Sequence, residues 1–168
     1  LPPQAAAGRV ALVVLRYWVG ERTPHVAPAA RAMCGGLTLG HERRNMRRAV
    51  MEGVAFALRD SLSIMLGLGV SCRRLIASGG GANSPLWLQI QAEVFNRATY
   101  RSTNGEQACL GAAIAAGVGF GVAPGIPPAC GRLVKSDDTC YPHHAAKVAV
   151  YDHGYEHTEQ VSPHHRGA

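Results

Sequence analysis

The segment Ser78-Gly79-Gly80-Gly81-Ala82-Asn83-Ser84 has the composition of a loop that can approach a ligand closely. Glycines let the backbone come near a bound molecule, and a helix that starts directly after them offers free N–H groups and the positive end of its dipole. The segment lacks the Gly-Lys-Ser/Thr of a phosphate-binding P-loop, and Ser84 occupies the third glycine position of a dinucleotide fingerprint. It predicts either a ligand-binding turn or a plain tight connection, and by itself it favours the plain connection.

A second concentration of reactive groups lies in the segment GERTPH, residues 20–25, where Glu21, Arg22, Thr23 and His25 are close neighbours. These groups could perform acid–base chemistry, or they could satisfy one another in a salt-bridged loop, and without geometry the salt-bridged loop is favoured. We assign no catalytic residue from the sequence. Near the end of the chain, His153 and His157 are one helical turn apart and could chelate a metal, but exposed histidines are the better expectation, so no metal ligand is assigned either.

Strand and helix patterns alternate along the chain, and this predicts an α/β fold. Apolar runs predict strands at 10–15, 74–78 and 98–101, and residues 34–39 are expected to be extended. Apolar spacing of three and four predicts helices over 41–66, 84–95 and 107–118, with a weaker helical pattern over 142–160. Ser84 and Pro85 are the residue types that begin a helix, and Gly67 and Gly69 are typical of a helix end.

The remaining segments complete a prediction of one domain. Residues 117–128 are rich in Gly and Pro and are expected to form a loop. Small residues in the helix over 107–118 should let it pack closely against a neighbouring helix, which is favoured over contact with a flat ligand; they are Ala108, Gly111, Ala112 and Ala115. We therefore assign residues 10–128 to the domain and 129–168 to its helical tail, and leave 1–9 unassigned.

The charge and the cysteines narrow the class of protein. The formal charge of +6 can attract nucleic acid, membrane surfaces or phosphorylated small molecules without choosing among them. Arg43, Arg44, Arg47 and Arg48 form the densest basic cluster and are expected on a solvated helix face, and no aromatics interleave with them as in single-strand nucleic-acid platforms. The five cysteines form no CxxC pair, which favours a reducing, cytoplasmic compartment. Neither a convincing signal peptide nor a membrane-length apolar run is found.

Several motifs together resemble the C-terminal domain of the FGGY carbohydrate kinases. The stretch YWVGERTPH at 17–25 is similar to a xylulokinase sequence, and the GERTPH element favours xylulokinases over glycerol kinases. GLTLGH at 36–41 with RAVMEGVAF at 48–56 resembles the family signature, and SGGGANSPLW at 78–87 resembles its adenosine-site glycine motif. ACLGAA at 108–113 and the tyrosines of the tail are also similar to the family. The resemblance covers residues 10–160.

The resemblance implies an actin-like ATPase (ribonuclease H-like) C-terminal lobe, with a mixed sheet flanked by helices. It implies ATP and Mg²⁺ as cofactors and phosphorylation of D-xylulose to xylulose 5-phosphate. Carried over by position, the residues that would line the adenosine end of the nucleotide are Gly80, Gly81 and Ala82, with Asn83 or Ser84 as polar contacts. In the family, the catalytic base, the sugar contacts and the phosphate loops lie upstream of the residues present here.

Three functions remain open at this stage. The first is the ATP-binding half of a kinase, expected to be inactive alone and able to reach the sugar only through the other lobe, with a homodimer as one possible assembly. The second is a truncated remnant or interaction module that binds no nucleotide. The third, a basic nucleic-acid-binding domain, rests on charge alone and ranks last, so neither nucleic acid nor a membrane is predicted as a partner.

Overall fold

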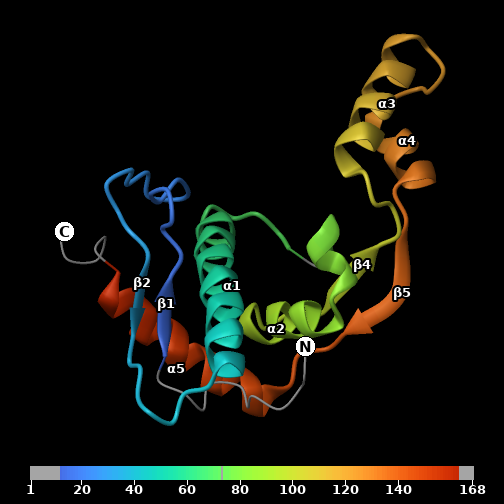
Figure 1. The fold of residues 1–168 in the computed structure, drawn as a ribbon. Coiled ribbons are helices and arrows are strands. Elements are labelled where there is room, and N and C mark those ends of the chain that lie inside the picture. Colours follow the sequence, from blue (N-terminus) through green and yellow to red (C-terminus); the bar gives the residue numbers. More distant parts are fainter. Residues whose placement is uncertain (1–11, 73, 163–168) are drawn as a thin grey trace.

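The computed structural model describes residues 12–72 and 74–162, and its strands form two small sheets (Figure 1). β1 (Val13–Leu15) pairs antiparallel with β2 (Met33–Gly35). In the second sheet, β3 (Leu75–Ala77) pairs in parallel with β4 (Thr99–Ser102), which pairs antiparallel with β5 (Ser136–Tyr141). The predicted α/β class and mixed sheet are confirmed. Of the first predicted strand, residues 13–15 are confirmed and residues 10 and 11 lie outside the described part, as does the unassigned segment 1–9.

The helices are α1 (Arg43–Gly67), α2 (Pro85–Val94), α3 (Gln107–Gly119), α4 (Ile126–Leu133) and α5 (Ala145–Val161), with a short 3-10 turn η1 (Gly80–Asn83) before α2. The long helix ends as predicted, because the N–H of Leu68 bonds to the carbonyl of Ile64 and Gly69 follows at φ 83°. Within the described residues, none of these helices has both the length and the apolar character that a membrane crossing requires.

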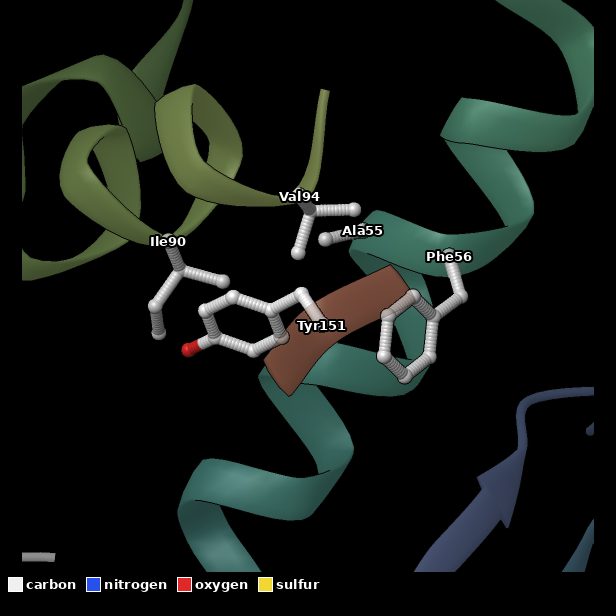
Figure 2. Close-up of a cluster of buried hydrophobic side chains, with 5 residues drawn as sticks. All are labelled: Ala55, Phe56, Ile90, Val94 and Tyr151. Carbon is white, nitrogen blue, oxygen red and sulfur yellow. The ribbon is translucent and has the colours of Figure 1, made fainter. Parts of the chain in front are cut away.

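The main core lies where α1, α2 and α5 meet. Figure 2 shows Ala55 and Phe56 of α1, Ile90 and Val94 of α2, and Tyr151 of α5 in contact. The ring of Phe56 meets that of Tyr151 edge to face, with 6.2 Å between centroids. Burying side chains of this size stabilises the fold by about 1.5–3 kcal/mol each. This core fixes α2, and therefore the start of α2, against the rest of the molecule.

A second, smaller cluster joins β1 to α1 through Leu12, Val14 and Ala49. Helix α1 lies very close to β1 at Gly53, where an added Cβ would overlap the backbone carbonyl oxygen of Val14. A glycine is therefore required at this position if helix and strand are to keep this separation.

The structure corrects three expectations about the elements. The predicted loop over 117–128 ends early, because Pro127 and Pro128 lie in the first turn of α4, where a missing N–H costs no helical hydrogen bond. β5 was not predicted, since its sequence SDDTCY has no apolar alternation and it depends on pairing with β4. The extended segment expected at 34–39 is a strand only at Met33–Gly35.

Two side-chain expectations are also wrong. Arg43, Arg44 and Arg47 are exposed as predicted, but the side chain of Arg48 is only 13% exposed and binds Glu52 at 2.7 Å. The small residues of α3 do not pack against a helix. All four are exposed, and α3 instead contacts α4, at the far end of β4 and β5 (Figure 1).

Candidate functional site

The glycine turn connects the end of β3 to the start of α2, as the sequence predicts. Gly79 has φ 77°, a backbone conformation that favours glycine, and this reverses the chain after Ser78. The carbonyl of Gly79 then accepts the N–H of Ala82 at 3.0 Å, and the carbonyl of Gly81 accepts the N–H of Ser84 at 3.1 Å. These bonds close η1 and fix the shape of the turn.

The predicted site residues divide into an exposed set and a structural set. Gly80, Gly81 and Asn83 are exposed, so their backbone can meet a ligand. Ala82 is only 4% exposed and packs inward. No described atom lies within 4 Å of a Cβ built on Gly80, whereas a Cβ on Gly81 would lie 3.2 Å from the indole ring of Trp87. The open surface of the turn therefore includes Gly79 and Gly80.

Ser84 caps α2, and this changes what the helix start can bind. Its Oγ accepts the N–H of Trp87 at 3.3 Å, and Pro85 has no N–H to offer. The sequence suggested a helix start with many free backbone N–H groups. Of the first three residues of α2, however, Pro85 has no N–H and Trp87 donates its N–H to Ser84. An N-terminus with so few free N–H groups suits an uncharged, polar group better than a phosphate.

The GERTPH segment is held by one hydrogen bond of its own and by an ion pair to α1, and not by the internal salt bridge that the sequence favoured. Glu21 is 6% exposed, and its carboxylate accepts the backbone N–H of His25 at 3.0 Å. The Nε2 of His25 lies 2.9 Å from the carboxylate of Asp60, whose other oxygen accepts the hydroxyl of Tyr155 at 3.4 Å. The pocket beside this loop measures only about 40 Å³, which is room for little more than water.

Three features of this region escaped the sequence analysis. Gly79 makes the positive-φ turn, although the resemblance pointed to the residues that follow it. Trp87 packs its indole ring under the turn, and only three-dimensional structure places it there. Thr99 is 1% exposed and its hydroxyl has no hydrogen-bond partner within the described residues. A spacing pattern carries no signal for any of these contacts.

A comparison with family models matches residues 2–120 to "FGGY family of carbohydrate kinases, C-terminal domain". Among curated proteins, the chain is 30% identical over 161 residues to the xylulose kinase of Bacillus subtilis, a match that covers 92% of this chain and 32% of that protein. The chain thus spans about a third of the length of the curated relatives it matches.

Solved structures of sugar kinases share this fold. The ligand-bound xylulose kinase from Lactobacillus acidophilus superposes with a TM-score of 0.86 at 26% identity, over 98% of this chain and 33% of that one. A gluconate kinase from the same organism superposes with a TM-score of 0.83 at 27% identity, over 94% of this chain and 32% of that one. Since kinases named for two different sugars match almost equally well, the fold alone does not identify the sugar.

Proposed function

We propose that this chain, which belongs to the FGGY family of carbohydrate kinases, supplies the ATP-binding half of such a kinase. The observation that carries the proposal is the glycine turn itself, which lies between β3 and α2 with Gly80 open to solvent. Its sequence resembles the family's adenosine motif, and its shape is fixed by its own backbone bonds. A turn that is rigid before the ligand arrives loses little conformational entropy on binding.

The turn fits the adenosine end of the nucleotide better than the phosphate end. Gly80 and Gly81 would let the backbone approach a flat base, and the amide of Asn83 is free to meet a polar edge of the nucleoside. Ala82 and Ser84 would act indirectly, because the first packs inward and the second caps α2. The few free N–H groups at the start of α2 argue for the same assignment.

Mg²⁺ would enter with the phosphates, and the described residues form no cluster of three or more protein ligands for it. Among residues 12–72 and 74–162, no group of three or more His, Cys, Asp or Glu side chains could hold a metal ion. In phosphoryl transfer the metal is bound through one or two carboxylates and the phosphate oxygens. We propose, from the resemblance to the family, that the phosphate contacts and the catalytic base lie in the part of the kinase that this chain does not match.

For the whole kinase we propose transfer of the γ-phosphoryl group of ATP to D-xylulose, giving D-xylulose 5-phosphate. The support is the name of the curated relatives and the GERTPH segment. The second candidate is a remnant or interaction module that binds no nucleotide, and the specific observation that favours it is the group of exposed apolar side chains Leu68, Val70 and Ile76. The proposed cytoplasmic location rests on the same kinship and on the unpaired state of the cysteines, all of which lie in the described part.

Titration calorimetry with Mg·ADP tests the nucleotide assignment. The blocking variant is Gly80→Trp rather than a change at Gly81, because a side chain at Gly81 would push Trp87 and disturb α2. Gly131→Trp is the matched control, since Gly131 of α4 is also exposed with open space around its Cα. We expect the parent and the control to bind ADP, and Gly80→Trp to bind at least about tenfold more weakly, a loss of about 1.4 kcal/mol. A folded parent that binds no ADP would favour the second candidate.

A further inference from the structure

The outward face of α5 carries two histidines whose spacing suits a metal ion. His153 and His157 are four residues apart within the helix, so their side chains lie on one face, a single turn apart. Both residues are exposed. Within residues 12–72 and 74–162, neither imidazole has a hydrogen-bond or ion-pair partner. The nitrogens of both rings are therefore available to a ligand from solvent.

The opposite face of α5 fixes this turn of the helix against the core. The carboxylate of Asp152 pairs with Arg59 of α1 at 2.7 Å. The ring of Tyr155 lies under the guanidinium of Arg59, 4.4 Å from it, and its centroid is 5.9 Å from that of Phe56. A helical turn that is anchored in this way holds its two histidines at a fixed spacing before any ion arrives. Little conformational entropy of the backbone is then lost on binding.

The charges around the pair favour a cation. Residues 152–161, the half of α5 that contains both histidines, include no lysine or arginine but three acidic residues, Asp152, Glu156 and Glu159. Glu156 is exposed and adjacent to His157. The same segment ends at the C-terminus of the helix, where the helix dipole is negative. The local charge is therefore opposite in sign to the formal charge of +6 of the whole chain.

The donor atoms select the class of metal ion. Neutral imidazoles suit late first-row divalent ions such as Ni²⁺ and Cu²⁺, whereas Mg²⁺ prefers oxygen ligands. In the described part of the chain, no group of three or more His, Cys, Asp or Glu side chains could hold a metal ion, so the pair is not completed by a third such ligand. A structural zinc site needs four protein ligands. The pair would instead hold an exchangeable ion that keeps water in its other coordination positions.

We propose that His153 and His157 form a two-histidine site for a late first-row divalent metal ion. The sequence favoured exposed, unligated histidines at these positions; the structure confirms the exposure and adds the shared helical face and the anchored turn. An ion bound to both side chains clamps one turn of α5, and α5 carries Tyr151 into the main core. Because only the folded helix has this spacing, the ion stabilises the folded chain. The site is separate from the Mg²⁺ that accompanies ATP and does not rest on the proposed function.

The test is a calorimetric titration of the full 168-residue chain with Ni²⁺, without nucleotide. His153→Ala and His157→Ala should each weaken the tightest binding step at least about tenfold, because the second imidazole of a chelating pair binds at a high effective concentration. The five free cysteines are the same in every variant, so any binding of Ni²⁺ by thiols cancels in the comparison. Excess Mg²⁺ should leave the affinity for Ni²⁺ unchanged, since it competes poorly for nitrogen ligands.

A matched double variant separates chelation from the mere number of histidines. His157→Gln combined with Gln160→His keeps the composition of the chain, and both positions are exposed on α5. The two imidazoles would then lie seven residues apart, about 10 Å along the helix axis, which is too far for one ion to bind both. This variant should bind Ni²⁺ at least about tenfold more weakly than the parent. His143→Ala changes an exposed histidine that precedes α5, and it should bind like the parent.

Urea unfolding gives a second readout. Saturating Ni²⁺ should raise the unfolding midpoint of the parent and of His143→Ala, and it should leave the midpoint of the double variant unchanged. Three results would overturn the proposal: no binding of Ni²⁺ by the folded parent, equal affinity in the parent and the double variant, or binding that His153→Ala retains and the pair His164→Ala and His165→Ala abolishes. Should one of the two single variants fail to fold, the other replaces it.

Discussion

Gly53 is the position where a single added methyl group should disturb the fold most clearly. In Gly53→Ala, the new Cβ would overlap the carbonyl oxygen of Val14 and lie 3.3 Å from the Val14 Cβ. A side chain could rotate away from such a contact, but a backbone carbonyl in β1 cannot, because β1 is held by its pairing with β2. Helix α1 and strand β1 must therefore move apart, and the packing of Leu12, Val14 and Ala49 loosens with them.

The expected cost follows from two opposing terms. Overpacking a closed contact costs about 1–3 kcal/mol, and a rigid backbone neighbour places this case near about 3 kcal/mol. Alanine has a higher helix propensity than glycine, and this offsets about 1 kcal/mol of the overpacking cost. The net loss in the free energy of unfolding is therefore about 2 kcal/mol, a balance of the two terms.

Gly154→Ala is the matched control, since Gly154 is also a helical glycine facing the core. Its Cβ would lie 3.2 Å from the ring of Phe56, a side chain that can shift by a few tenths of an ångström, so the propensity gain should offset the contact. Urea unfolding followed by circular dichroism measures both variants. With an m-value of about 2 kcal/mol/M, the midpoint of Gly53→Ala should fall by about 1 M. A Gly53→Ala midpoint equal to or above that of Gly154→Ala would refute the reasoning.

Three further predictions concern side chains that hold the helices. Ser84→Ala removes the cap on Trp87 and should cost about 1 kcal/mol in urea unfolding, whereas Ser84→Asp should retain most of it. Tyr151→Phe removes a hydroxyl that accepts from Arg48 at 2.7 Å and donates to Glu52 at 2.9 Å, and should cost about 2 kcal/mol. Burial, and next the charge of Glu52, raise the pKa of Tyr151. The stability that the hydroxyl contributes should therefore be constant below the unfolded pKa of about 10 and decline as the pH rises above it. Between about pH 8 and 11, the urea midpoint should fall less in Tyr151→Phe than in the parent. Lys147→Met should destabilise the folded chain more than Glu93→Gln does. Without Lys147, the Glu93 side chain, which is only 1% exposed, loses a cationic partner and keeps only His144, whereas the half-exposed Lys147 is solvated even without Glu93. Unfolding midpoints in the reverse order would contradict this prediction.

The elements that the sequence predicts correctly are those with a local signal. The apolar period of α1, the Ser84-Pro85 start of α2 and the glycines after β3 each act within a few residues of themselves. β5 depends on a partner strand more than thirty residues earlier in the chain, and its own residues have no β pattern. Local patterns identify such a strand only when its buried face alternates, and the sequence SDDTCY does not.

The position of the candidate site could be predicted from the sequence, but the role of each residue in it could not. The turn from 78 to 84 is visible as a glycine run, yet nothing in the sequence separates exposed Gly80 from inward-packed Ala82. Arg48 shows the same limit. Four clustered arginines indicate a solvated face, but Arg48 is drawn inward by Tyr151, which lies 103 residues further along the chain. Contacts at that separation arise only from the tertiary fold.

The tail beyond the family match packs in the core that supports the site, although it lies far from the turn in sequence. The family model ends at residue 120, but Tyr151 of α5 is 1% exposed and packs between α1 and α2 in the main core. Its hydroxyl also joins Arg48 and Glu52 on α1, so α5 holds α1 by both apolar and polar contacts. α2 begins at the glycine turn and rests on this three-helix core, and the orientation of the turn therefore depends on α5. We propose on this basis that the tail and the glycine turn unfold together, as parts of one cooperative unit.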